Sequence, residues 1–72
     1  MLKIGNNIRN IRRRQGFTQE ALASLLHLTP QAISSWEIDR TLPDAERLAE
    51  LAKVLDCSAD EILGLNKKGL SH

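Results

Sequence analysis

Aromatic side chains are almost absent from this 72-residue chain. Phe17 and Trp36 are the only two, and there is no tyrosine. A chain of this length buries about 60% of the surface that its unfolded form exposes. Its core must therefore be small and mainly aliphatic, and we expect one domain in which each large apolar residue matters for stability.

Cysteine and histidine are also scarce. Cys57 is single, so no disulfide can form within the chain, which favours a reducing, cytoplasmic setting. His27 and His72 have no spaced partner, which argues against a zinc site. No glycine-rich phosphate loop or nucleophile motif is present, and the adjacent carboxylates Asp60 and Glu61 suit the first turn of a helix. We expect no catalysis, no metal and no cofactor.

Long apolar runs are missing, since none approaches the about 20 residues of a membrane span. We therefore expect no membrane partner. The basic start, MLKIGNNIRNIRRR, leads into no signal-type apolar stretch, and a mitochondrial-type leader is the less favoured alternative. Residues 1–17 carry five basic residues and no acid, whereas residues 18–72 carry five basic residues and nine acids. This asymmetry suits a polyanionic partner, but a solvated basic helix explains it equally well.

What the chain does contain is helical periodicity. A first helix is predicted over residues 4–15, with Gly16 as its C-terminal cap. Thr18 caps a second helix. Its expected buried stripe is Leu22, Leu25 and Leu26. Thr29 followed by Pro30 predicts the start of a third helix, because proline at the first helical position loses no hydrogen bond.

Two further helices follow a loop, IDRTLP. The fourth is predicted to begin near Asp44, and its buried stripe is Leu48, Leu51, Ala52 and Leu55. Ser58 and Glu61 form a capping box that opens the fifth, which ends near Gly64. With no strand signal, the prediction is an all-α domain over residues 1–66 and a mobile tail over residues 67–72.

The connection between the second and third helices is short, around His27 and Leu28. It leaves too little chain for an antiparallel hairpin of long helices and is typical of a helix-turn-helix crossing at a steep angle. Ala23 lies where the two helices would approach most closely. The apolar positions of this unit are Leu22, Leu26, Leu28, Ile33 and Trp36.

The run FTQEALASLLHLTPQAISSWEIDRTLP, followed by LAELAKVLDCSADEILG, resembles the phage repressor and Cro type of helix-turn-helix domain, also called the xenobiotic-response-element family. The resemblance covers about residues 4–65. It includes the order of five helices, "TQ" opening the second, "W-E" ending the third and "LP" before the fourth. It implies a compact, five-helix lambda-repressor-like fold and a sequence-specific, usually homodimeric DNA-binding domain of bacteria and their viruses.

Two positions depart from the family pattern. His27 stands where the family commonly has glycine, and the loop after the third helix often has glycine near Asp39. If these positions need a left-handed backbone, histidine and aspartate tolerate it better than most other residues.

The third helix has a short, uncharged outer face. With Ile33 toward the core and 100° per residue, Trp36, Glu37 and Arg40 fall within about 60° of it. The opposite side carries Gln31, Ser35 and Ile38, with Ser34 beside them. An ordinary solvated helix would carry lysine and glutamate there.

Such a face suits insertion into the major groove of DNA. Gln31 is the main candidate for reading a base, because glutamine pairs with adenine N6 and N7, and the alternative is an ordinary surface glutamine. Ser34 and Ser35 follow as candidates, and Pro30 and Ala32 are expected to touch a thymine methyl group.

Phosphate contacts are expected from helix N-termini and flanking residues. The resemblance places Thr18 and Gln19 against the DNA backbone and makes Arg40 and Thr41 a clamp on a neighbouring phosphate; Thr29 belongs to the same set. Arg9 and Arg13 add long-range attraction or are merely solvated.

The family also implies a pair between Arg12 and Glu37 that fixes the third helix to the scaffold, with a phosphate contact by Arg12 as a secondary role. Trp36 is assigned to the core rather than to base stacking, because it lies beside Ile33. Cys57 is expected to fill space between the fourth and fifth helices.

The favoured function is a transcriptional regulator, most simply a repressor, that binds a palindromic operator as a homodimer. Candidates for the dimer surface are Ile62, Leu63 and Leu65, although some of these must also close the core. One alternative is the antitoxin of a toxin–antitoxin pair, which binds a toxin protein and also represses its own operon. A further alternative is a protein-interaction module that keeps the fold without reading bases.

Overall fold

The computed structural model describes residues 3–65 and places five helices in that range, with no strand there. The helices are α1 (Ile4–Arg14), α2 (Gln19–Leu26), α3 (Pro30–Glu37), α4 (Ala45–Val54) and α5 (Ala59–Leu63). The predicted all-α fold and the order of its helices are confirmed. The predicted tail, residues 67–72, lies outside the described residues, so the boundary after residue 66 stays a prediction.

Four of the five helices begin at a side-chain cap. Thr18, Thr29, Asp44 and Ser58 each accept a hydrogen bond from the backbone N–H three residues further on. Ser58 and Glu61 complete the predicted capping box. The exception is α1, whose N-cap residue, Lys3, supplies no side-chain hydrogen bond.

All five helices end in the same way. The residue that leaves each helix has a φ between 55° and 82°, and the next backbone N–H donates to a carbonyl five residues earlier. The five left-handed residues are Gly16, His27, Asp39, Asp56 and Gly64. The left-handed backbone expected at His27 and Asp39 is confirmed, whereas that of Asp56 was not foreseen.

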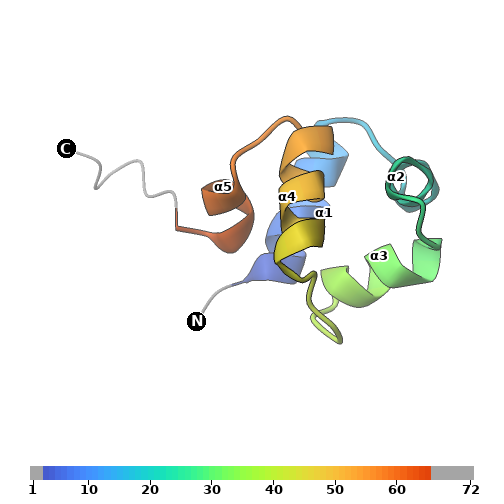
Figure 1. Ribbon diagram of the computed structural model, residues 1–72, viewed down its shortest axis with the longest axis horizontal. Coiled ribbons are helices and arrows are strands. Elements are labelled where there is room, and N and C mark those ends of the chain that lie inside the picture. Colours follow the sequence, from blue (N-terminus) through green and yellow to red (C-terminus); the bar gives the residue numbers. More distant parts are fainter. Residues whose placement is uncertain (1–2, 66–72) are drawn as a thin grey trace.

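The helices pack around one small aliphatic core. Helix α1 contacts α3 and α5, α2 contacts α3 and α4, and α5 also contacts α4. As a result α2 and α3 lie at one end of the molecule and α5 at the other (Figure 1). The buried apolar residues are Ile8, Ile11, Leu22, Ala23, Leu26, Ile33, Trp36, Leu51, Leu55 and Ile62.

One predicted core residue is wrong. Leu25 is 53% exposed, whereas Leu22 and Ala23 are buried. On the circumference of α2, Ala23 and Leu26 lie on one side of Leu22 and Leu25 lies on the other. Only the first side meets α3 and α4, so the small Ala23 takes the core position that the sequence assigned to Leu25.

Trp36 and Cys57 lie where the sequence placed them. Trp36 is 6% exposed, and Cys57 is half-buried against the core between α4 and α5. Burial raises the pKa of the Cys57 thiol. No helix within residues 3–65 has the length and apolar character that a bilayer crossing requires, and the same range holds no cluster of three or more potential metal ligands.

Candidate nucleic-acid interface

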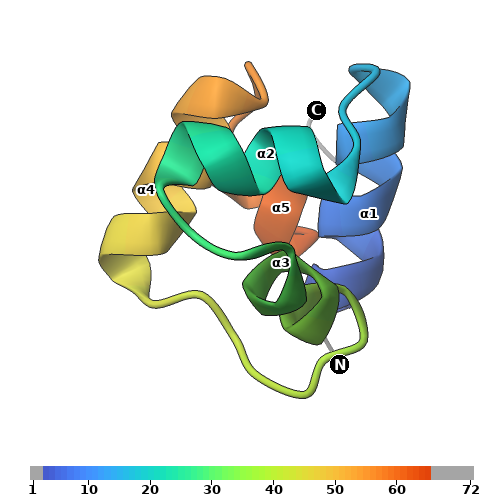
Figure 2. The same ribbon diagram turned by 90° about the vertical axis from the view of Figure 1, so that its right-hand side faces the viewer.

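A short turn sets α3 steeply across α2. His27 leaves α2 with a φ of 58°, and Thr29 caps α3 by accepting the N–H of Ala32 at 3.3 Å. Pro30 occupies the first turn of α3, as predicted. In Figure 2, α2 runs across the view while α3 is seen nearly end-on beneath it. The predicted helix-turn-helix geometry is confirmed.

The inner face of α3 is fixed to α1 and α2 by burial and by an ion pair. Ile33 and Trp36 are in the core, and the Glu37 carboxylate is buried beside them. Arg12 donates through Nε and Nη2 to the two carboxylate oxygens of Glu37, the second bond measuring 3.1 Å. Arg12 is itself buried, and its Nη1 donates to the carbonyl of Phe17 at 2.8 Å. Its guanidinium therefore faces the scaffold.

Two further side chains surround Glu37. Gln19 Nε2 donates to Glu37 Oε1 at 3.1 Å, and Arg9 Nε lies 3.6 Å from the same oxygen. Burial alone would raise the pKa of Glu37, but the hydrogen bonds from Arg12 and Gln19 and the charges of Arg12 and Arg9 hold it below its ordinary value. The hydrogen bond to Glu37 likewise raises the pKa of Arg12. Both groups remain ionised in the neutral range.

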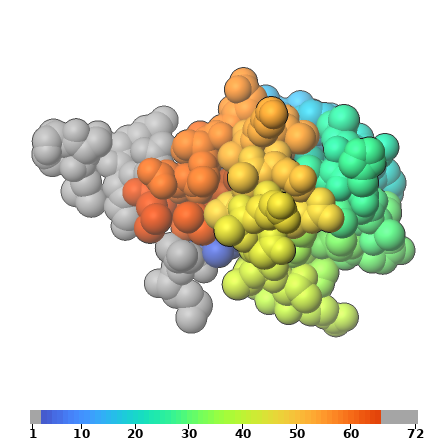
Figure 3. Space-filling view, viewed as in Figure 1, coloured from blue at the N-terminus to red at the C-terminus, as the bar shows by residue number. Residues whose placement is uncertain are grey.

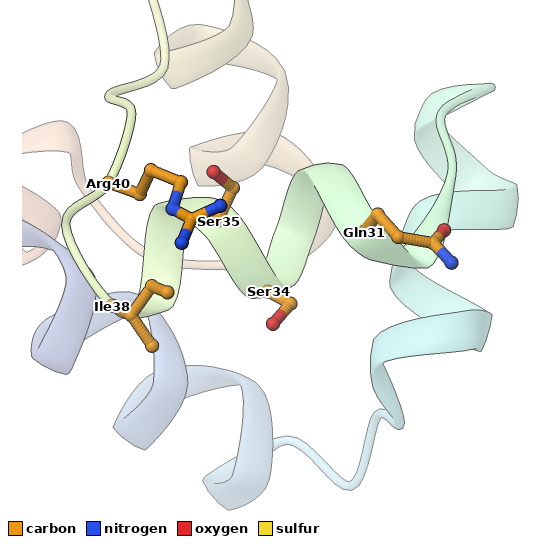
Figure 4. A pocket seen from close by; sticks show the side chains of 5 residues that line it. All are labelled: Gln31, Ser34, Ser35, Ile38 and Arg40. Carbon is orange, nitrogen blue, oxygen red and sulfur yellow. The ribbon is translucent and has the colours of Figure 1, made fainter.

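The outer face of α3 carries two shallow hollows. One is lined by Gln31, Ser34, Ser35, Ile38 and Arg40, and the other by Gln19, Glu20, Pro30, Gln31 and Ser34. Figure 4 shows the first hollow: Gln31 lies at the N-terminal end of α3, Ile38 and Arg40 at its C-terminal end, and Ser34 between them. Gln31 and Ser34 belong to both hollows, so four of the five residues predicted to read bases share one surface with Arg40. The fifth, Ala32, lines neither hollow.

The predicted contact residues differ in their freedom to move. Gln31 is exposed, and Pro30, Ala32, Ser34 and Ser35 are half-buried. The hydroxyl of Ser35 accepts a hydrogen bond from Thr41 Oγ1 at 3.1 Å, so it is held in place.

The cap hydroxyls of Thr18 and Thr29 are exposed, and among residues 3–65 each only accepts a hydrogen bond from its own helix. Their hydroxyl protons stay available to another acceptor.

The angular placement of Arg40 is wrong. Counting 100° per residue put it on the inner side, but α3 ends at Glu37 and the left-handed Asp39 turns the chain. Arg40 is exposed and lines the outer hollow instead. The loop that follows projects from the body of the molecule at the lower edge of Figure 3.

Two residues of this surface had no assigned role. Ile38 is 57% exposed inside the first hollow, and the helical count had already placed it on the outer side. Glu20 brings a carboxylate to the second hollow. Its position directly after Gln19, in the first turn of α2, was the available signal.

One candidate for the dimer surface is also wrong. Ile62 is fully buried within this chain, so it cannot meet a second copy. The turn of α5 that carries it closes the core against α1 and α4, which leaves no part of its side chain outside. Leu63, the last residue of α5, is half-buried, and Leu65 is 52% exposed. Helix α5 lies at the end of the molecule away from α3 (Figure 1).

Comparison with known proteins agrees with this geometry. The profile of the helix-turn-helix family HTH_3 matches residues 8–62. Repressor protein C2 of Salmonella phage P22 is 38% identical over 60 residues, which is 83% of this chain and 28% of that protein. The HTH-type transcriptional regulator DicA of Escherichia coli K12 is 39% identical over 62 residues, covering 86% of this chain and 46% of DicA.

A solved structure extends the likeness to three dimensions. The crystal structure of the P22 c2 repressor protein in complex with a synthetic operator superimposes with a TM-score of 0.80 at 36% identity, over 88% of this chain and 96% of that one. This chain spans less than half the length of the two curated relatives above. The family profile nevertheless covers most of it, and the chain belongs to the Cro/C1-type helix-turn-helix family of phage repressors and bacterial transcriptional regulators.

Proposed function

We propose that this chain binds double-stranded DNA with sequence specificity and regulates transcription by inserting α3 into the major groove. The observation that carries the proposal is the outer face of α3, where an exposed glutamine stands among short, uncharged side chains. Its inner face is fixed by core burial and by the Arg12–Glu37 pair, so the helix can present that outer face rigidly.

The dimensions of helix and groove explain why short side chains matter. An α-helix with its side chains is about 10–12 Å across, and the major groove is about 12 Å wide and 8.5 Å deep. Long side chains on the outer face would hold the helix away from the bases. Ser34, Ser35 and Ala32 let the backbone approach the groove floor, and Gln31 then reaches a base edge.

The chemistry of the bases assigns the roles. Gln31 pairs with adenine N6 and N7, because its amide presents an N–H donor and a carbonyl acceptor side by side at the matching spacing. Ser34 and Ser35 offer a hydroxyl to either kind of edge, and Pro30 and Ala32 pack against a thymine methyl group.

The phosphate contacts surround this reading surface. Thr18 and Thr29 lie at helix N-termini, where backbone N–H groups and the helix dipole favour an anion. Gln19, Arg40 and Thr41 complete the set from α2 and from the loop after α3. Arg40 supplies the full positive charge of this group.

One copy of α3 reads only a few base pairs, so we propose a homodimer on a palindromic operator, with the two α3 helices about 34 Å apart. Leu63 and Leu65 are the remaining candidates for the dimer surface. A repressor is favoured by the names of the relatives, which describe a phage repressor and transcriptional regulators, over the antitoxin and interaction-module alternatives. Such a regulator acts in the cytoplasm, where bacterial DNA lies, on DNA and a second copy of itself.

Selection from a library of random duplexes tests the proposal. The expected result is an enriched, two-fold symmetric motif whose half-sites are about one helical turn apart. Enrichment of a single half-site would support sequence-specific DNA binding but contradict the homodimer. A pool that stays random over successive rounds, at low salt, would contradict sequence-specific binding altogether.

A further inference from the structure

The first turn of α1 is capped from outside its own helix. Lys3 provides no side-chain cap, but the backbone N–H of Gly5 donates to Asp39 Oδ1 at 3.0 Å. The two residues are 34 positions apart in the chain. The Asp39 carboxylate therefore takes the role that threonine, aspartate or serine plays locally at the other four helices.

Gly5 makes this contact possible because the two backbones nearly touch. A Cβ at Gly5 would lie 2.3 Å from the carbonyl oxygen of Trp36 and 2.8 Å from that of Glu37. The positive end of the α1 dipole thus faces the last carbonyls of α3, a favourable arrangement. The N-terminus of α1 and the C-terminus of α3 form one joint, and Asp39 closes it.

The backbone turn at this joint does not by itself require aspartate. Asp56 leaves α4 with a φ of 55°, close to the 60° of Asp39, yet its side chain makes no hydrogen bond among residues 3–65. Gly16 and Gly64 make the same kind of turn with no side chain at all. The carboxylate of Asp39 is therefore not needed to form the turn, and its distinct contribution is the hydrogen bond that it accepts from Gly5.

We propose that Asp39 is a positioning residue for the DNA-binding surface. The hydrogen bond that its carboxylate accepts from the Gly5 N–H, which we call the latch, holds the chain leaving α3 against α1. It thereby fixes the direction in which Arg40 and Thr41 approach a phosphate. This inference rests on the proposed function. Ile38 and Arg40, the two neighbours of Asp39 in the chain, both line the hollow on the outer face. A rotation of the backbone at Asp39 therefore displaces them together.

The remaining bonds at the exit of α3 cannot replace the latch. The N–H groups of Arg40 and Thr41 both point to the carbonyl of Ser35, at 2.9 and 3.4 Å. These bonds tie the loop to α3 itself and not to the scaffold. Among residues 3–65, the Gly5–Asp39 bond is the only hydrogen bond that ties this loop to α1.

Two substitutions separate the latch from charge and from backbone strain. Asp39→Asn and Asp39→Gly both remove the negative charge, and both residues tolerate a left-handed φ. Asparagine keeps an oxygen that can accept from Gly5, and glycine does not. The matched control is Asp56→Gly, which makes the same change in the same conformation outside the joint.

Binding to the selected duplex and to a scrambled duplex is to be measured by fluorescence anisotropy at 10 °C, once circular dichroism has been used to check that each variant is folded. We expect Asp39→Gly to bind both duplexes about three- to tenfold more weakly than Asp39→Asn, the effect of one hydrogen bond. The ratio between the duplexes should not change, because phosphate contacts carry no sequence information. Asp56→Gly should bind like the wild type.

Hydrogen exchange of the Gly5 amide tests the latch without DNA. Protection is expected in the wild type and in Asp39→Asn, and fast exchange in Asp39→Gly. An unprotected Gly5 amide in the wild type overturns the latch, whether or not the variants fold. Equal affinities of Asp39→Gly and Asp39→Asn, with the wild type still selecting its duplex, overturn only this inference. A wild type that binds no duplex overturns the proposed function and this inference with it.

Discussion

Within α3, the inner side chains Ile33, Trp36 and Glu37 are at most 6% exposed, whereas Gln31 on the outer side is exposed to solvent. The inner side is determined by the rest of the chain, because each of its groups has a partner in α1, α2 or the core. The outer side has few such partners. Its geometry is set indirectly, through the helix on which it is carried.

This difference separates two kinds of mutational effect. Changes on the inner face should alter the free energy of unfolding, and they alter DNA binding only by displacing α3. Changes on the outer face should leave the free energy of unfolding within about 0.5 kcal/mol and alter binding directly.

Glu37→Ala is expected to lower the free energy of unfolding by about 3–5 kcal/mol, because it leaves the buried Arg12 guanidinium without its partner. Urea denaturation measures the loss. Ser34→Ala, on the outer face of the same helix, is the control and should change stability by less than about 0.5 kcal/mol. A loss below about 1 kcal/mol for Glu37→Ala would show that water reaches Arg12 and solvates it.

Replacing both partners sharpens the result. In a variant with Arg12→Met and Glu37→Leu, no buried charge remains, and most of the lost stability should return. If the double variant were as unstable as Glu37→Ala, the pair would contribute through its geometry rather than through charge compensation.

The same pair predicts an acid-sensitive stability. The pKa of Glu37 is lower in the folded chain than its ordinary value, so ionised Glu37 favours folding. That contribution is complete above the unfolded-state pKa of about 4.3 and is lost as pH falls from there through the folded-state value. Thermal unfolding between pH 2 and 7 should show a shallower acid slope for Glu37→Gln than for the wild type. Equal slopes would assign the acid sensitivity to other carboxylates.

The inner face and the helix boundaries were largely predictable from the sequence. Thr18, Thr29 and Ser58 mark helix starts because each side chain accepts a hydrogen bond from a backbone N–H within the first turn of its own helix. Tertiary packing does not override these caps. Ile33 and Trp36 follow from helical spacing. Such signals depend on neighbours in the chain and therefore survive without a structure.

The errors occur where two distant segments meet. Ala23 and Leu25 flank Leu22 on opposite sides of α2, and only the positions of α3 and α4 decide which of the two is buried. Arg40 was misplaced because the helical count continued past the end of α3. The contact between Gly5 and Asp39 joins residues 34 positions apart, and no local pattern announces it.

Gln31→Ala should weaken binding to the selected duplex by about 1–3 kcal/mol and relax preference at one base position. The free energy of unfolding should not change, since Gln31 is exposed. Gln15→Ala is the matched control: that amide donates to the carbonyl of Leu55, and Gln15 lines neither hollow of α3. An equal loss on every sequence would make Gln31 a backbone contact.

Arg40→Ala tests the smallest effect, a single phosphate contact. Because the charge of Arg40 releases counterions from DNA without reading bases, its removal should weaken binding to all sequences alike. The slope of log K against log salt should become shallower by about one unit. Arg14→Ala removes the same charge near Glu61 of α5 and should leave the slope unchanged. If both variants changed the slope equally, the positive charge would act at long range, and the exit of α3 would hold no defined phosphate contact.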